Sequence, residues 1–105
     1  LILPRPAPWP HEHSWHIFTP LLDTERLGFS RDEFMSRMKQ LNIGTALHYQ
    51  ALHLFTCYHN ITGLGRGDLP EAEYVSDRIV SLPLFPAMTD QDAADTVEAV
   101  RSVCA

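Results

Sequence analysis

Eight prolines constrain this chain more than any other feature, because proline fixes its own φ angle and offers no N–H group to a helix or a sheet. Half of them alternate near the start of the chain, at Pro4, Pro6, Pro8 and Pro10. This pattern favours an extended segment without internal hydrogen bonds. We therefore expect residues 1–12 to form an extended connector and residues 13–105 to form the folded domain. Since the chain begins with Leu1 rather than Met, we expect it to be the C-terminal piece of a longer protein.

Length and charge limit what the chain can do. With 105 residues it has room for a single domain with one modest core. Thirteen acidic residues against eight basic ones give a net charge of −5, which argues against nucleic acid as a partner, because neutralising phosphates needs clustered Lys and Arg. No apolar stretch has the length of a membrane-spanning helix or a signal peptide, so we expect no membrane partner. The two distant cysteines, Cys57 and Cys104, are expected to be free, buried thiols, which points to the cytoplasm.

Local patterns predict three helices. Ser30 and Glu33 have the spacing of a capping box and begin the first helix. Pro70 suits the first turn of the second helix, where its missing N–H is not needed, and Thr89 caps the third. The apolar sides of the three helices are expected at Phe34, Met35, Met38 and Leu41, at Tyr74, Val75, Ile79 and Leu82, and at Ala93, Val97, Val100 and Cys104.

Three further segments are expected to be extended. Ser14–Leu22 mixes aromatic and β-branched residues, as half-buried strands do, and the other two are Ile43–Tyr49 and Val80–Phe85. Residues 50–58 are expected to be short helical or irregular structure, and residues 59–69, rich in glycine, an exposed loop. The alternation of strands and helices predicts an α/β fold of the α+β-like kind. It would consist of a short sheet covered by about three helices.

Three residues are candidates for lining a substrate cleft: His48, Tyr49 and His53. His48 ends the second expected strand, where a side chain can project over the sheet edge, and Tyr49 adds a second hydrogen-bonding group. Histidine titrates near neutral pH, which suits both binding and proton transfer. A hydrogen-bonded position inside the core is the alternative for either histidine.

Other patterns give weaker signals. The histidines His11, His13 and His16 lack a further ligand at suitable spacing, so we expect no metal site. The glycines between residues 63 and 67 fail the context of a phosphate loop, because no buried strand precedes them and no Gly-Lys-Ser or Gly-Lys-Thr follows. Cys57 has apolar and aromatic neighbours, which favour burial over a nucleophilic role.

Four motifs resemble the C-terminal domain of the DegT/StrS sugar aminotransferases: Asn42-Ile-Gly-Thr-Ala-Leu-His-Tyr49, Leu52-His-Leu54, Leu69-Pro-Glu-Ala-Glu73 and Ser81-Leu-Pro-Leu-Phe-Pro-Ala-Met-Thr-Asp90. The last of them is the most specific. The opening His13-Ser-Trp-His16 is similar to the strand with which that domain begins. The resemblance spans roughly residues 12–103.

The resemblance implies the C-terminal small domain of a fold-type I aminotransferase. The parent enzyme would use pyridoxal phosphate to transfer an amino group, usually from glutamate, to a nucleotide-linked keto sugar, as a homodimer that supplies polysaccharide biosynthesis. In this family the Schiff-base lysine belongs to the large N-terminal domain, which would be the main partner of this chain. Lys39, the only lysine here, is expected on the solvent side of a helix and cannot replace it. We therefore expect no catalytic and no cofactor-binding residue in this chain, and no activity from the chain alone.

The sequence departs from the family pattern in one region. Residues 51–54 lack the proline that often precedes Leu-His, and Phe55-Thr56-Cys57 replaces a more polar stretch. A different class of function also fits the composition, namely a noncatalytic α+β module that docks on a protein or small ligand through its histidine-rich edge.

Overall fold

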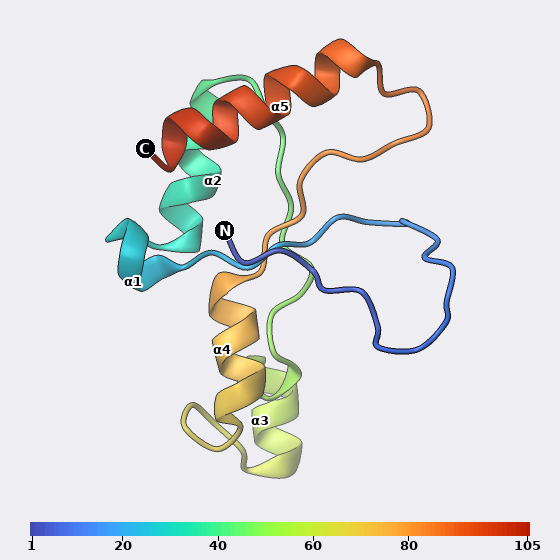
Figure 1. Cartoon of the computed structure of the whole chain (residues 1–105). Helices are drawn as coiled ribbons and strands as arrows, with labels where there is room; N and C mark the ends of the chain where they lie inside the picture. Colours follow the sequence, from blue (N-terminus) through green and yellow to red (C-terminus); the bar gives the residue numbers. More distant parts are fainter.

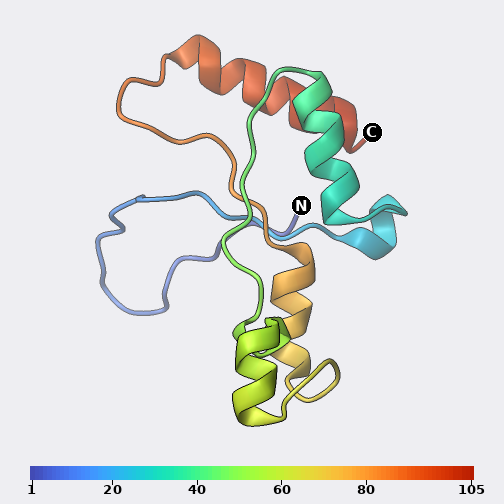
Figure 2. The ribbon, with the colours of Figure 1, turned by 180° about the vertical axis from the view of Figure 1, so that it is seen from behind.

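The computed structural model describes all residues from Leu1 to Ala105 and is built from helices joined by long extended segments. Helices α2 and α5 lie against each other at one end of the molecule, while α3 and α4 both lie toward the other end (Figure 1). The reverse view shows the same division (Figure 2). No helix combines the length and apolar character that crossing a membrane requires. In chain order the elements are α1 (Thr24–Leu27), α2 (Arg31–Gln40), the 3-10 turn η1 (Leu52–Leu54), α3 (Thr56–Thr62), α4 (Pro70–Arg78) and α5 (Asp90–Val103).

The three helices predicted from cap residues are confirmed as α2, α4 and α5. At the start of α5 the capping box is complete, because the Thr89 hydroxyl accepts from the backbone N–H of Asp92 while the Asp92 carboxylate accepts from that of Thr89. At the start of α2 only half of the box forms. The Ser30 hydroxyl accepts from the Glu33 N–H at 3.2 Å, but the Glu33 carboxylate pairs with Arg37 one turn later.

The apolar core lies where α2 and α5 meet two of the extended segments. Its side chains are Leu22, Phe34, Met38, Val80, Ala99 and Val103. Phe34 and Met38 are one turn apart on α2 and are fully buried, which stabilises the fold by roughly 1.5 to 3 kcal/mol for each side chain. The core therefore fixes α2, α5 and the segments around Leu22 and Val80 as one body.

Two of the expected apolar sides are only partly confirmed: Leu82, Val100 and Cys104 pack against the core, but the most deeply buried residues of both helices lie on other sides. On α5 the buried residues include Thr96, whose hydroxyl donates to the Asp92 carbonyl of its own helix, and Val97 is half exposed. On α4 the buried residues are Glu73 and Ser76, and the apolar residues beside them are exposed. Polar side chains with satisfied hydrogen bonds have taken the inward positions in both helices.

The expected short sheet is not found. The extended segments meet only in four isolated antiparallel bridges: Ile2 with Leu21, Phe18 with Leu82, Leu21 with Ile79 and Ala46 with Ser81. A ladder needs donors at regular intervals, and Pro20 and Pro83 interrupt them beside these bridges. Trp15, with a φ of 46°, turns the first expected strand out of extended geometry. The segments therefore cross near the centre of the molecule without forming continuous strands (Figure 1).

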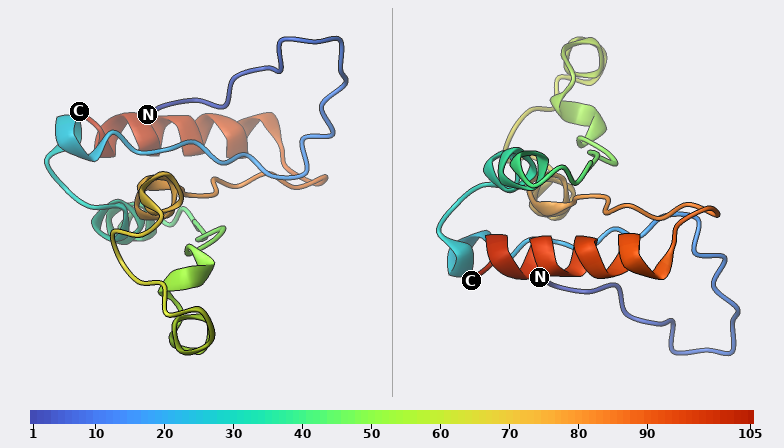
Figure 3. Two further views of the ribbon diagram at one scale, coloured as in Figure 1. Left: turned by 90° about the horizontal axis from the view of Figure 1, so that it is seen from below. Right: turned by 90° about the horizontal axis from the view of Figure 1, so that it is seen from above.

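The opening segment leaves the body of the molecule and returns to it. Ile2 and Leu21 exchange two backbone hydrogen bonds of 2.8 and 2.9 Å, and the chain between them swings away from the helices (Figure 3). Farther on, α3 occupies several residues that were expected to lie in a loop. It ends at Gly63, whose φ of 73° lies in the left-handed region that glycine adopts without strain. The exposed loop is therefore shorter than expected, covering residues 64–69.

Candidate functional site

Two buried serines hold the segment that carries the candidate residues His48 and Tyr49. Ala46 and Ser81 exchange backbone hydrogen bonds of 3.1 and 2.8 Å, and the Ser76 hydroxyl accepts from the N–H of Ala51 at 2.9 Å. Ser76 lies on α4 and Ser81 lies just beyond it. The segment between Ala46 and Ala51 is thus fixed at both ends to one neighbouring stretch of chain.

His48 is half buried, and its Nδ1 lies 2.5 Å from the Ser81 hydroxyl. Its ring meets the Tyr49 ring edge-on, with centroids 5.0 Å apart and an interplanar angle of 75°. Tyr49 itself is 75% exposed. The hydrogen bond to Ser81 orients the imidazole and leaves Nε2 without a partner in the chain, so Nε2 and the tyrosine hydroxyl are both available to a polar ligand.

His53 has different surroundings. It is buried, and its Nε2 lies 3.0 Å from a carboxylate oxygen of Glu73 on α4. The same carboxylate accepts from the backbone N–H groups of Gly67, at 2.8 Å, and Leu69, at 3.2 Å. These hydrogen bonds, that from His53 first, hold the pKa of Glu73 below its ordinary value although burial opposes the shift. His53 is directed into this network, and its contact with a substrate stays a prediction.

The sequence interpretation missed the roles of Ser76, Ser81 and Glu73. Glu73 had only the expected role of an acidic residue near a helix start, because its partner His53 is far away along the sequence. The two serines lack any pattern of their own. The one available signal was their place within or beside the family motifs at residues 69–73 and 81–90.

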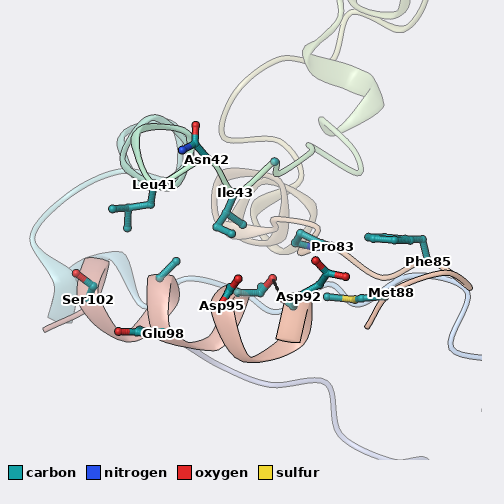
Figure 4. A pocket seen from close by; sticks show the side chains of 13 residues that line it. Leu41, Asn42, Ile43, Pro83, Phe85, Met88, Asp92, Asp95, Glu98 and Ser102 are labelled. Carbon is teal, nitrogen blue, oxygen red and sulfur yellow. Dashed lines mark hydrogen bonds between the residues drawn. The ribbon is translucent and has the colours of Figure 1, made fainter. Parts of the chain in front are cut away.

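A groove with a volume of about 690 Å³ runs between α5 and the segments at residues 41–44 and 83–88. Apolar side chains form one wall, and the carboxylates of Asp92, Asp95 and Glu98 lie along α5 (Figure 4). Hydrogen bonds from Thr89 keep the pKa of Asp92 below its ordinary value, so this carboxylate is charged at neutral pH. A row of negative charges repels phosphate, and the groove is therefore unsuited to the diphosphate group of a nucleotide-linked sugar.

The remaining lysine, cysteine and histidine candidates are exposed, partly buried without a partner, or bonded to nearby backbone groups. Lys39 is exposed on α2. Cys57 is free and exposed, so its expected burial is wrong, because α3 buries none of its residues. Cys104 is free and half buried, and burial raises the pKa of its thiol.

The Nδ1 atoms of His11 and His13 contact backbone groups of Trp9 and Trp15. No group of three or more His, Cys, Asp or Glu side chains is placed to hold a metal ion.

Comparison with known proteins extends this description. The model of the DegT/DnrJ/EryC1/StrS aminotransferase family matches residues 2–101. Uncharacterized protein MJ1066 of Methanocaldococcus jannaschii is 41% identical over 92 residues, which are 88% of this chain and 24% of that protein.

Solved structures agree with this match. DesV of S. venezuelae, determined in complex with a ketimine intermediate, has a TM-score of 0.82 at 31% identity, over 96% of this chain and 25% of that one. The aminotransferase TlmJ from Streptoalloteichus hindustanus has a TM-score of 0.78 at 28% identity, with the same coverage. The chain thus spans about a quarter of the length of these relatives. The resemblance of the sequence motifs is confirmed, and the chain belongs to the DegT/DnrJ/EryC1/StrS aminotransferase family.

Proposed function

We propose that this chain is the C-terminal part of a pyridoxal-phosphate-dependent aminotransferase that transfers an amino group from an amino acid, glutamate, to a nucleotide-linked keto sugar. The supporting observation is a family match over residues 2–101 in a chain that covers only a quarter of DesV and TlmJ. Within the parent, residues 1–12 are the connector and residues 13–105 the small domain. The parent is proposed to act as a cytoplasmic homodimer that supplies amino sugars for polysaccharides.

The residues of this chain do not fit the cofactor. Pyridoxal phosphate needs a lysine held against it in a site closed to water. Lys39 instead borders an open depression on the outer side of α2, beside Asp32 and Ser36. The one buried carboxylate, that of Glu73, is already occupied by His53 and two backbone N–H groups. The cofactor and the reacting lysine are therefore assigned to the part of the parent outside this chain.

The contribution of this chain is proposed to be one wall of the substrate cleft. His48 and Tyr49 would contact the sugar nucleotide or the amino donor through Nε2 and the phenol hydroxyl. The hydrogen bonds between this segment and the hydroxyls of Ser76 and Ser81 support the proposal, because groups on a fixed backbone lose little freedom when they bind. The acidic groove beside α5 is excluded from this role by its charge.

The test uses the full-length parent. The purified protein is given pyridoxal phosphate, glutamate and a panel of nucleotide-linked keto sugars, and both 2-oxoglutarate and the aminated sugar are measured. We expect an absorbance band of the bound cofactor and amino transfer to at least one sugar. A protein that binds the cofactor but aminates only small keto acids would contradict the substrate class. One that binds no cofactor would contradict the whole proposal.

A further inference from the structure

Arg31, the first residue of α2, contacts the C-terminal end of α4. Its Nη1 donates to the backbone carbonyl of Ser76, 45 residues away along the sequence, and its side chain is only 14% exposed. The start of α2 and the C-terminal end of α4 lie close together (Figure 1). Through Nε and Nη2 the same guanidinium contacts the carboxylate of Asp32, which is 79% exposed. Arg31 therefore links α2, which contributes to the apolar core, to α4.

The carbonyl of Ser76 needs this donor because it lies in the last turn of its helix. A helical carbonyl accepts from the N–H group four residues later, which here belongs to Val80. The Val80 N–H instead donates to the carbonyl of Pro20 at 3.2 Å. Ser76 is 4% exposed, so little water reaches it in place of a helix partner. Arg31 thus satisfies a buried carbonyl that the helix leaves free, at the end where the helix dipole favours a positive charge.

The hydroxyl of the same serine holds the segment of the proposed cleft. It accepts from the N–H of Ala51 at 2.9 Å, and Ala51 follows His48 by three residues. Two hydrogen bonds, one to the carbonyl and one to the hydroxyl of Ser76, therefore lead from α2 to the segment that presents His48 and Tyr49. A shift of Ser76 is expected to move this segment, because a serine side chain is too short to absorb it.

Polar contacts place this end of α4. No apolar residue of α4 belongs to the core or packs against it. Besides the Arg31 contact, the Leu22 N–H donates to the Arg78 carbonyl at 2.9 Å, and the Arg78 guanidinium pairs with Glu25. Both of these contacts act on Arg78, beyond the residue that binds the cleft segment. The contact from Arg31 acts on Ser76 itself.

We propose that Arg31 is a positioning residue of the substrate cleft. By holding the Ser76 carbonyl, it sets where the segment at residues 46–51 presents Nε2 of His48 and the hydroxyl of Tyr49. Arg31 touches no substrate itself. The inference rests on the proposed place of His48 and Tyr49 in the cleft of the parent enzyme. Small displacements of a group that contacts the reacting complex have large kinetic effects, so the loss of Arg31 should slow a parent enzyme that still folds.

Steady-state kinetics of the full-length parent, measured per folded enzyme, tests this role. We expect Arg31→Gln to lower kcat/KM by about 5- to 50-fold, mainly through kcat. Arg31→Lys keeps a charged donor and should recover part of the loss. Asp32→Asn is the matched control, because it removes the exposed partner of Arg31 and leaves the bond to Ser76. Normal kinetics in Arg31→Gln, or an equal loss in Asp32→Asn, would overturn the proposal.

A double variant separates positioning from a purely structural role. In a parent that already carries His48→Ala, adding Arg31→Gln should lower kcat/KM by about 2-fold or less, because the main group that Arg31 positions is gone. A purely structural role would give the same loss in both backgrounds. Additive losses would therefore reject the proposal.

Hydrogen exchange at residue resolution gives a readout that does not depend on the proposed reaction. In the parent, the Ala51 amide should exchange at least 10-fold faster in Arg31→Gln than in wild type, and at the wild-type rate in Asp32→Asn. Unchanged exchange in Arg31→Gln would overturn the inference, whether or not the parent transfers an amino group. Faster exchange in a parent that aminates no sugar would support the placement of this segment by Arg31 and contradict the proposed function.

Discussion

The carboxylate of Glu73 accepts a hydrogen bond from Nε2 of His53 at 3.0 Å, and both side chains are buried. This contact joins η1 to α4, which otherwise meet without an apolar core. Glu73 also accepts from the N–H groups of Gly67 and Leu69, so one carboxylate fixes the glycine-rich loop as well. Removing its charge leaves buried donors without a strong acceptor.

We therefore expect Glu73→Gln to lower the melting temperature of the chain by roughly 10 °C. The pKa of Glu73 is held below its ordinary value, so its contribution to stability is present above that value and is lost as pH falls through the lowered pKa. The difference in melting temperature between wild type and variant should shrink as the pH is lowered through and below the ordinary pKa of a glutamate. Glu71→Gln, an exposed change on the same helix, should have little effect at any pH. A difference that grows on acidification would contradict the assignment.

Cap chemistry made three helices predictable because it is local. Ser30, Pro70 and Thr89 each act on backbone groups within the next turn, so the signal and its effect lie in adjacent residues. Whether the extended segments pair into a sheet cannot be predicted in the same way. A strand needs donors and acceptors from a distant segment, and only one residue pair at each crossing meets with the required geometry.

The same distinction between local and long-range interactions applies to the candidate site. Tyr49 is exposed and His48 is half buried, but the strand that was expected to end at them does not form, so their contact with a substrate stays a prediction. The burial of His53 depends on Glu73, and the orientation of His48 depends on Ser81, which lies far along the chain. Neither partner can be identified from spacing, because side-chain pairing between distant segments is decided by the fold.

The buried face of α5 can be checked by two truncations. Phe34→Ala on α2 should lower the free energy of unfolding by about 3 to 5 kcal/mol, because it opens a cavity between α2 and α5. Val97→Ala, on the side of α5 first expected to be apolar, should change it by about 0.5 kcal/mol or less. Chemical denaturation of both variants measures these values. A large loss from Val97→Ala would show that α5 buries the side predicted from its periodicity.

The two thiols should differ in reactivity. Cys57 is exposed on α3, whereas Cys104 is half buried with its thiol pKa raised by burial, so less of Cys104 is present as thiolate. We expect an aromatic disulfide reagent at pH 8 to label Cys57 at least 10-fold faster than Cys104. The variants Cys57→Ser and Cys104→Ser identify which thiol reacts in each phase. Faster labelling of Cys104 would contradict the structure at the end of α5.

The isolated chain should neither bind pyridoxal phosphate nor transfer an amino group. Its only lysine is exposed on α2 and lies in an open depression, where nothing excludes water from an imine. Dialysis after incubation with the cofactor should leave no absorbance band of an aldimine. A band that survives dialysis and disappears in Lys39→Ala would show that this chain holds the cofactor after all.

His48 provides the sharpest test of the proposed cleft. If its unpartnered Nε2 hydrogen-bonds the sugar nucleotide or the amino donor more strongly in the transition state, His48→Ala in the full-length parent should lower kcat/KM by about 10- to 1000-fold, or roughly 1.4 to 4 kcal/mol. Ser81→Ala keeps the imidazole but removes the hydroxyl that orients it, so we expect a smaller loss. His11→Ala, in the opening segment, serves as the control and should leave kcat/KM unchanged.

A structural role for His48 predicts the opposite pattern. The hydrogen bond to Ser81 would then matter mainly for folding, and its loss would cost about 1 to 3 kcal/mol of unfolding free energy with little change in the kinetics of the folded enzyme. Measuring both quantities on the same His48→Ala preparation separates the two roles. Because His48 is only half buried, we expect the kinetic loss to exceed the loss of stability. Near-normal turnover with a strongly lowered melting temperature would reject its place in the cleft.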